Sequence, residues 1–397
     1  MSRQRLDAVL FTIVAGYFLL LYSLPGIRYY QTFQLQNFDY GILYHSTWRL
    51  SAGLDSFMTV RGVYSWADNQ EYLQWLLVPL HWFPGTPFAL LGLHALALWG
   101  SGVAAFLLLR PRRAAGLLVA LFVWTSPFLR NMSLDLIHVE AFAPLLLLLL
   151  YAACRAGRSV AALVFTALAS ACKEDVAISV IALLAVVAVD TRSFPIPRRV
   201  ALVGLVFAVG VLAVDLLVVL PHFTDATCQR LDPRIGALVG VAEPVSPFFH
   251  GLRGKLLSPG FYAQRLARPE TLLYLASLLW PVLIVLPRAP LLALLPLPAA
   301  FINTLAAGGY FVEGYWHYDH STFAMVAIAV VHAVSSAPRP VAWAGLLVAG
   351  NLAWGGVASP EPRVGLRDPL RAEFWDLATA ESVQSAQALA RTLHSTS

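Results

Sequence analysis

Charged residues are scarce in this 397-residue chain: Asp, Glu, Lys and Arg make up 12% of it. A typical soluble domain carries about 25%. Hydrophobic residues make up 58%, and the mean hydropathy is +0.68. A soluble fold of this size could not cover its surface with so few charges. The composition therefore excludes a soluble protein and predicts an all-α, polytopic integral membrane protein.

Lysine and cysteine are also rare. Lysine occurs twice, so the basic residues are nearly all arginine, and 27 basic against 22 acidic residues form no basic tract. This excludes nucleic acid as a partner. The three cysteines, Cys154, Cys172 and Cys228, provide neither a disulfide framework nor the spacing of a cysteine metal site.

The N-terminal apolar run, residues 8–27, follows Arg3 and Arg5. It holds 20 residues without a charge and has no clear A-x-A cleavage site. Both features indicate a retained transmembrane helix rather than a signal peptide.

Ten more charge-free runs follow. Pro84-Gly85-Thr86-Pro87 divides the longest into a dipping or interfacial helix, 72–83, and a span, 88–109. Several runs reach only about 21–24 Å, less than the roughly 30 Å of a hydrocarbon core. We therefore expect short helices that extend into polar flanks or end inside the protein. The runs after the first are 72–109, 114–129, 141–154, 159–172, 176–189, 200–214, 271–287, 289–312, 321–338 and 340–360.

The short connections between these runs carry most of the arginines, which favours a cytoplasmic location for them. All can be cytoplasmic only if residues 159–189 cross twice, with Lys173-Glu174-Asp175 on the outer side. The alternative is one 31-residue helix with three charges in its middle, which is costlier. The connections carry Arg3, Arg5, Arg110, Arg112, Arg113, Arg155, Arg158, Arg192, Arg198, Arg199, Arg288 and Arg339.

This arrangement predicts about eleven spans, a cytoplasmic N-terminus and an outer C-terminus. The membrane domain would cover residues 1–357, with outer loops 28–71 and 222–270. Residues 358–397 would form an outer tail with a short helix. Of the 22 acidic residues, 19 then lie outside or at outer helix ends, so we expect the protein to act at its outer face.

Asp39 follows the first span, within Asn37-Phe38-Asp39-Tyr40-Gly41-Ile42. An acid among aromatic residues and glycine at a membrane surface could act as a general base. It could equally cap a helix that starts at Tyr40, and spacing alone favours the cap.

Asp135, His138 and Glu140 lie at the outer mouth of the predicted fourth span. Asp135 and His138 are three residues apart and would share a face of a helix. They could bind a metal, relay a proton or hold a phosphate, or form a solvated helix end. Glu140 begins an apolar run, where a carboxylate without a partner is costly.

Lys173, Glu174 and Asp175 separate two short apolar helices. Charges at membrane depth need partners or water. Lysine binds phosphate as a point charge, and the acids could hold an arginine or a metal. An exposed turn is the alternative, and the shortness of the flanking helices disfavours it.

The segment 313–320 precedes a late span and reads Glu313-Gly-Tyr-Trp-His317-Tyr318-Asp-His320. Two histidines three apart near an acid can form a metal site, whereas Tyr and Trp also mark membrane interfaces. The lone histidines of the apolar runs, His81, His94 and His332, are expected to be hydrogen-bonded core residues.

These motifs, in this order, resemble an uncharacterised bacterial family of predicted membrane proteins grouped with the GT-C glycosyltransferases. The resemblance covers most of residues 8–340. It departs at Asp68-Asn69-Gln70-Glu71, where the family often has an Asp-His pair. The matching residues are Phe38, Asp39, Gly41, Ile42, Asp135, His138, Lys173, Glu174, Asp175, His317 and Tyr318.

The resemblance implies a GT-C-like fold in the bacterial inner membrane. It implies transfer of a sugar, with inversion, from a polyprenyl-phosphate donor to a glycan, lipid or protein acceptor on the extracytoplasmic face. Asp39 would be the general base. Lys173 and His138 would neutralise the phosphate, with His317 or His320 next, and Glu174 and Asp175 would orient Lys173 or a metal. Tyr318 would contribute to binding, supported by Asp135, Glu140, Asp68 and Glu313.

Two other classes stay open. A transporter or lipid flippase would also place polar groups at membrane depth, but it should show internal repeats, and none is evident. A non-catalytic scaffold would not need the charges at 173–175. A divalent metal is left open, and no cofactor is required by the sequence.

Overall fold

The computed structural model describes residues 3–31, 37–59, 63–68, 70–135, 137–223, 258–305, 312 and 317–358. Nearly all secondary structure in these segments is helical, which confirms the all-α class. A two-stranded antiparallel hairpin joins β1 (Phe57–Met58) to β2 (Val63–Tyr64) and was not predicted. Residues 224–257 and 359–397, and so most of the predicted second outer loop and tail, lie outside the described residues.

The helices follow in chain order. They are α1 (Arg3–Gln31), α2 (Asn37–Ser51), α3 (Ser65–Asp68), α4 (Thr86–Leu108), α5 (Arg113–Trp124), α6 (Pro127–Leu134), α7 (Ala143–Arg155), α8 (Ser159–Ser170), α9 (Glu174–Val189), α10 (Arg198–Val214), α11 (Leu220–Phe223), α14 (Pro259–Leu266), α15 (Pro269–Val285), α16 (Pro290–Ala293), α17 (Leu297–Leu305), α18 (His320–Ser336) and α19 (Pro340–Ala358). Shorter turns are η1 (Tyr72–Leu76), η2 (Val78–Trp82), η3 (Arg110–Arg112), η4 (Val139–Phe142) and η7 (His317–Asp319), with a π-helical turn η5 (Asp215–Val219).

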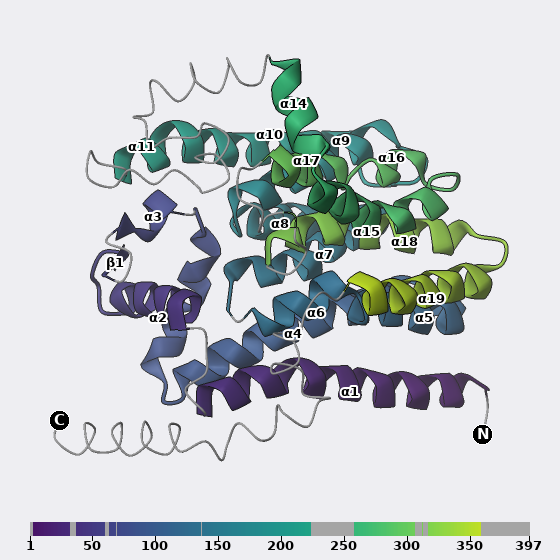
Figure 1. Ribbon diagram of the computed structural model, residues 1–397, viewed down its shortest axis with the longest axis horizontal. Helices are drawn as coiled ribbons and strands as arrows, with labels where there is room; N and C mark the ends of the chain where they lie inside the picture. Colours follow the sequence, from purple (N-terminus) through teal and green to yellow (C-terminus); the bar gives the residue numbers. More distant parts are fainter. Residues whose placement is uncertain are drawn as a thin grey trace.

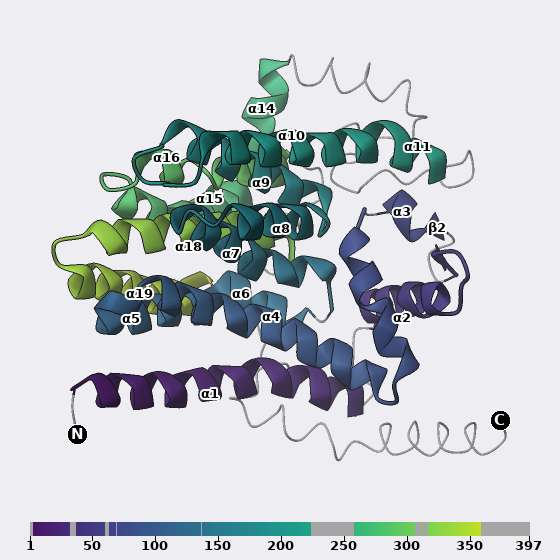
Figure 2. The ribbon, with the colours of Figure 1, turned by 180° about the vertical axis from the view of Figure 1, so that it is seen from behind.

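Helix α18 forms the centre of the bundle. Every residue from His320 to Val331 is buried, and the helix packs against α7, α9 and α15. A helix that is apolar on all sides has no face for water, so it is surrounded by other helices. In Figure 1 it lies between α1, at the lower edge, and α10, at the upper edge, and Figure 2 shows the same order from behind.

Three helical segments in the described part of the chain are long and apolar enough to cross a membrane: Arg5–Gln31, Thr86–Leu108 and Arg198–Phe223. Two bent pairs raise the number to five, α5 with α6 (51°) and α14 with α15 (74°). The run 114–129 was expected to be one helix, and the break between Trp124 and Pro127 corrects this. The protein is thus a helical membrane protein, whereas the eleven spans stay a prediction.

The two predicted segments of the run 72–109 are confirmed. Residues 72–82 form two 3₁₀ turns, η1 and η2, and α4 begins at Thr86 as a candidate span. Trp75, Leu76 and Trp82 are exposed on the turns. Aromatic residues are typical of membrane interfaces, and the interfacial position of this segment stays a prediction.

The stretch 159–189 is a hairpin of two helices, α8 and α9, as predicted. The connections before α8 and after α9 meet, since a Cβ on Gly157 would lie 3.7 Å from the carbonyl oxygen of Pro195. Lys173 is therefore at the opposite end of the hairpin from Arg158 and Arg192.

The bundle has an arginine-bearing end. Arg112 donates from Nη1 to the carbonyls of Val334 (3.3 Å) and Ala337 (2.9 Å), which places the α4–α5 connection against the end of α18. The Phe194 ring packs on His332 of α18 at 6.2 Å. In Figure 1 the N-terminus and the α18–α19 connection lie at the right, and α2, α3 and β1 lie at the left.

Candidate functional site

Asp39 lies in the first turn of α2 and is half-buried. The helix begins at Asn37, two residues before Asp39, so the expectation that Asp39 caps a helix starting at Tyr40 is wrong. A carboxylate in a first turn is stabilised by the partial positive charge of the helix N-terminus. The Asp39 side chain is therefore held at the helix end without serving as its cap.

Asp135 and His138 are neighbours, but not through a shared helix face as expected. Helix α6 ends at Leu134, Ile137 has a positive φ of 64°, and His138 is extended. A positive φ is uncommon in a residue other than glycine and is typical of turns. With the chain turned at Ile137, His138 Nε2 lies 3.6 Å from Asp135 Oδ1.

The charge of His138 depends on the acids around it. Burial lowers the pKa of the imidazole, but the carboxylates of Asp135, Glu140 and Asp39 act against this and raise it to about 9. In the metal-free protein His138 is therefore an imidazolium at neutral pH.

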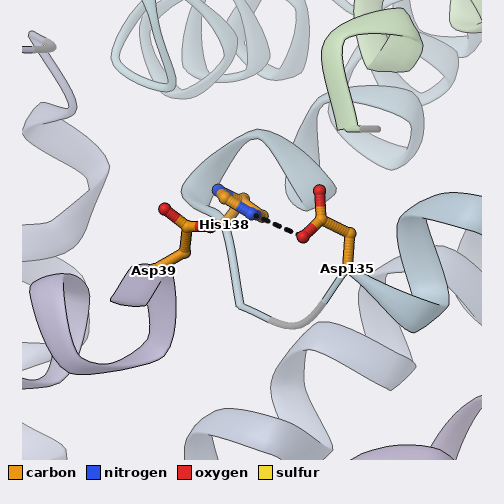
Figure 3. A group of neighbouring side chains, drawn as sticks. All are labelled: Asp39, Asp135 and His138. Atoms are coloured by element: carbon orange, nitrogen blue, oxygen red, sulfur yellow. Dashed lines mark ion pairs between the residues drawn. The ribbon is translucent and has the colours of Figure 1, made fainter. Parts of the chain in front are cut away.

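Asp39, Asp135 and His138 converge from two distant parts of the sequence. One ligand atom from each lies within 4.8 Å of the other two. Figure 3 shows the His138 ring between the two carboxyl groups, with the ion pair to Asp135 drawn as a dashed line. Two carboxylates and an imidazole can exchange protons or hold a divalent cation.

Glu140 and Lys173 form a second, deeper element of the site. Their side chains make a direct ion pair, and both residues are buried. Glu140 thus has the partner that its position in an apolar run requires. The sequence analysis expected Glu174 and Asp175 to orient Lys173, but this contact comes from η4, 33 residues earlier.

Asp175 belongs to a third cluster at the start of α18. Its Oδ2 accepts a hydrogen bond from Ser321 Oγ (3.0 Å) and lies 3.0 Å from His320 Nε2. All three residues are buried. Glu174 is buried beside it in the first turn of α9. His320 is therefore joined to an acid of α9, and the two predicted segments 173–175 and 313–320 meet.

Tyr274 and Asn303 belong to the same region and were missed by the sequence analysis. Tyr274 donates to Asp319 Oδ1 (2.7 Å), and Asn303 Nδ2 donates to Tyr274 Oη (3.2 Å) and to the Tyr318 carbonyl (3.1 Å). Asn303 lies in the apolar run 289–312, and an amide at that depth needs partners. An isolated polar residue in this run was the signal that could have predicted a hydrogen-bonded cluster here.

These residues lie within a recognised family. A family model described as "Predicted membrane protein (DUF2079)" matches residues 29–353, which include every site residue described above. The chain belongs to the DUF2079 family. Searches of curated proteins and of solved structures give no match.

For three of the predicted site residues of this DUF2079 protein, the structure does not describe the side chain. Glu313 and the side chains of Asp68 and His317 lie outside the described residues, so their roles stay predictions. The three lone histidines are confirmed as hydrogen-bonded: His81 with Thr47 (2.8 Å), His94 with the Met132 carbonyl (3.1 Å) and His332 with Tyr151 (3.0 Å).

Proposed function

We propose that this DUF2079 protein is a GT-C-like glycosyltransferase of the bacterial inner membrane. It transfers a sugar from a polyprenyl-phosphate donor to an acceptor on the extracytoplasmic face, with inversion, and Asp39 is the general base. The observation that carries the proposal is the position of Asp39. It is half-buried and close to His138 and Asp135. It belongs to α2, which lies at the opposite side of Figure 1 from the α18–α19 connection.

The reaction needs a base and a cation close together. The acceptor oxygen forms a bond to the anomeric carbon, the bond from that carbon to the phosphate oxygen breaks, and the acceptor proton passes to the base. A general base contributes roughly 10²–10⁴-fold. Asp39 is suited to take the proton because its carboxylate is close to the surface.

The departing polyprenyl phosphate needs positive charge. His138 meets this need as an imidazolium beside Asp39. Lys173 lies deeper and is bound to Glu140, so a phosphate reaching it would compete with that carboxylate. His138 is therefore the first cation of the mechanism and Lys173 the second.

The test is sugar release from a panel of polyprenyl-phosphate sugars by purified protein. Wild type should turn over at least one donor, and Asp39→Asn should lose about 10²–10⁴-fold while folding and binding lipid normally. Asp55→Asn is the matched control, because Asp55 is an exposed acid that pairs with Arg49 instead. Full activity of Asp39→Asn would remove Asp39 as the base.

A transporter or lipid flippase is the second candidate. The observation that favours it is the pair of bent helices, α5 with α6 and α14 with α15, since discontinuous helices line transport sites. Folded protein that releases no sugar from any donor but moves a labelled polyprenyl phosphate across a vesicle membrane would replace the first proposal with this one.

A further inference from the structure

Two carboxylates and one imidazole converge in a small volume at the mouth of the bundle. Asp39 comes from the first turn of α2, Asp135 follows α6, and His138 precedes η4. Their ligand atoms lie within 4.8 Å of one another, and Asp135 Oδ1 is 3.6 Å from His138 Nε2. Ligand atoms around one cation, with bonds of about 2.0–2.2 Å, are separated by roughly 3–4 Å. The contact of Asp135 with His138 already has this spacing, and the remaining pairs lie within 4.8 Å.

The local charge also calls for a cation. Asp135 is buried close to a second carboxylate, that of Asp39, and two nearby like charges disfavour each other. The third nearby acid, Glu140, is compensated by Lys173. His138 supplies one positive charge beside these two carboxylates when it is protonated. A divalent cation bound by the neutral ring would supply two, and would so offset both carboxylates.

We propose that Asp39, Asp135 and His138 bind one divalent cation of the Mn²⁺ or Zn²⁺ class. Imidazole with carboxylate suits these ions, whereas Ca²⁺ takes six to eight oxygen ligands. Three protein ligands leave coordination positions open, as in catalytic rather than structural sites.

The open positions connect the cation to the proposed reaction. If the glycosyltransferase assignment holds, an open position would accept a phosphate oxygen of the donor. The cation would then take the place of the His138 proton, since a ligating imidazole is neutral, and would share the leaving-group charge with Lys173. A carboxylate has two oxygens, so Asp39 can bind the cation with one and face the acceptor with the other. Only this role rests on the proposed function, because binding of the cation needs no substrate.

The experiment titrates Mn²⁺ into chelator-treated, full-length protein in detergent and follows free Mn²⁺ by electron paramagnetic resonance. Wild type should bind one ion per chain, with displacement by Zn²⁺. His138→Gln and Asp135→Asn should each weaken binding by tenfold or more, since loss even of groups that only orient ligands costs about 10–100-fold. Asp55→Asn should bind as wild type, because its carboxylate pairs with Arg49.

A second measurement needs no variant. Electron spin echo modulation of Mn²⁺ bound to wild type should show coupling to an imidazole nitrogen, and His138→Gln should abolish that coupling. Absence of bound Mn²⁺ and Zn²⁺ in wild type, or unchanged binding in both variants, would overturn the site. Bound metal without sugar release would retain it and count against the glycosyltransferase alone.

Discussion

At the scale of single residues, the buried Glu140–Lys173 ion pair should contribute to the stability of the fold, because each charge offsets the other. Lys173→Met would leave the Glu140 carboxylate buried without this cation. We expect a loss of about 3–5 kcal/mol in the free energy of unfolding. Adding Glu140→Gln should recover most of it, because the remaining amide carries no charge.

The measurement is chemical unfolding in detergent of the two single variants and the double variant. A double variant as unstable as Lys173→Met would show that Lys173 stabilises the fold through contacts other than Glu140. The folded double variant also separates two roles of Lys173, since loss of sugar transfer with recovered stability supports phosphate binding.

The sequence could predict that some residues need partners, but not which partners they have. Glu140 at the start of an apolar run required a cation, and Lys173 between short helices required an anion. Their pairing depends on how η4 packs against the start of α9, which spacing along the chain does not encode. Asp135 and His138 were correctly expected to be close, yet the cause is the positive φ of Ile137 and not a helix face.

At the scale of helices, α4 and α5 pack through a glycine. A Cβ on Gly102 would lie 2.3 Å from the indole of Trp124, which is buried and donates to the Trp99 carbonyl (2.9 Å). Small residues allow such close contact between membrane helices. Gly102→Ala should cost about 1–3 kcal/mol through overpacking.

Gly92→Ala is the matched control on the same helix. Its Cβ would meet nothing within 4 Å, so the better helix propensity of alanine should leave stability unchanged or raise it by up to about 1 kcal/mol. Chemical unfolding in detergent should therefore give a lower free energy of unfolding for Gly102→Ala than for Gly92→Ala. Equal stability of the two would mean that the Trp124 ring can move aside at no cost.

The apolar runs predicted where most helices lie. They did not predict every point at which a helix breaks or continues. Pro84-Gly85-Thr86-Pro87 marked the start of α4 correctly, because proline and glycine act locally. The run 289–312 carries a comparable signal in Pro296 and Pro298, at the division between α16 and α17, but it was read as one segment. Helix α10 was expected to end at Val214 but continues through the π-helical turn η5, where Asp215 is buried and bonds to Tyr72. That partner lies 143 residues away, beyond the reach of a local pattern.

At the scale of the whole molecule, the polar residues divide between two ends. The described acids of the site belong to one end. There η1 bonds to η5, Lys173 to η4, and α18 to α9. The Arg112 and Arg155 side chains belong to the other, near the C-terminal end of α18. This division was predictable in outline, because the positive-inside rule acts on short connections and requires no knowledge of packing.

The orientation of that division is testable with single cysteines in intact cells. We expect the arginine-bearing end in the cytoplasm, so Asp55→Cys should react with an impermeant maleimide added outside, and Thr191→Cys should react only after the membrane is opened. Both positions are exposed. The background carries Cys228→Ser, while Cys154 and Cys172 are buried and unreactive by position. The reverse pattern would place Asp39 and His138 in the cytoplasm, where the outer-face donor of the proposed reaction is absent, and would exclude that reaction.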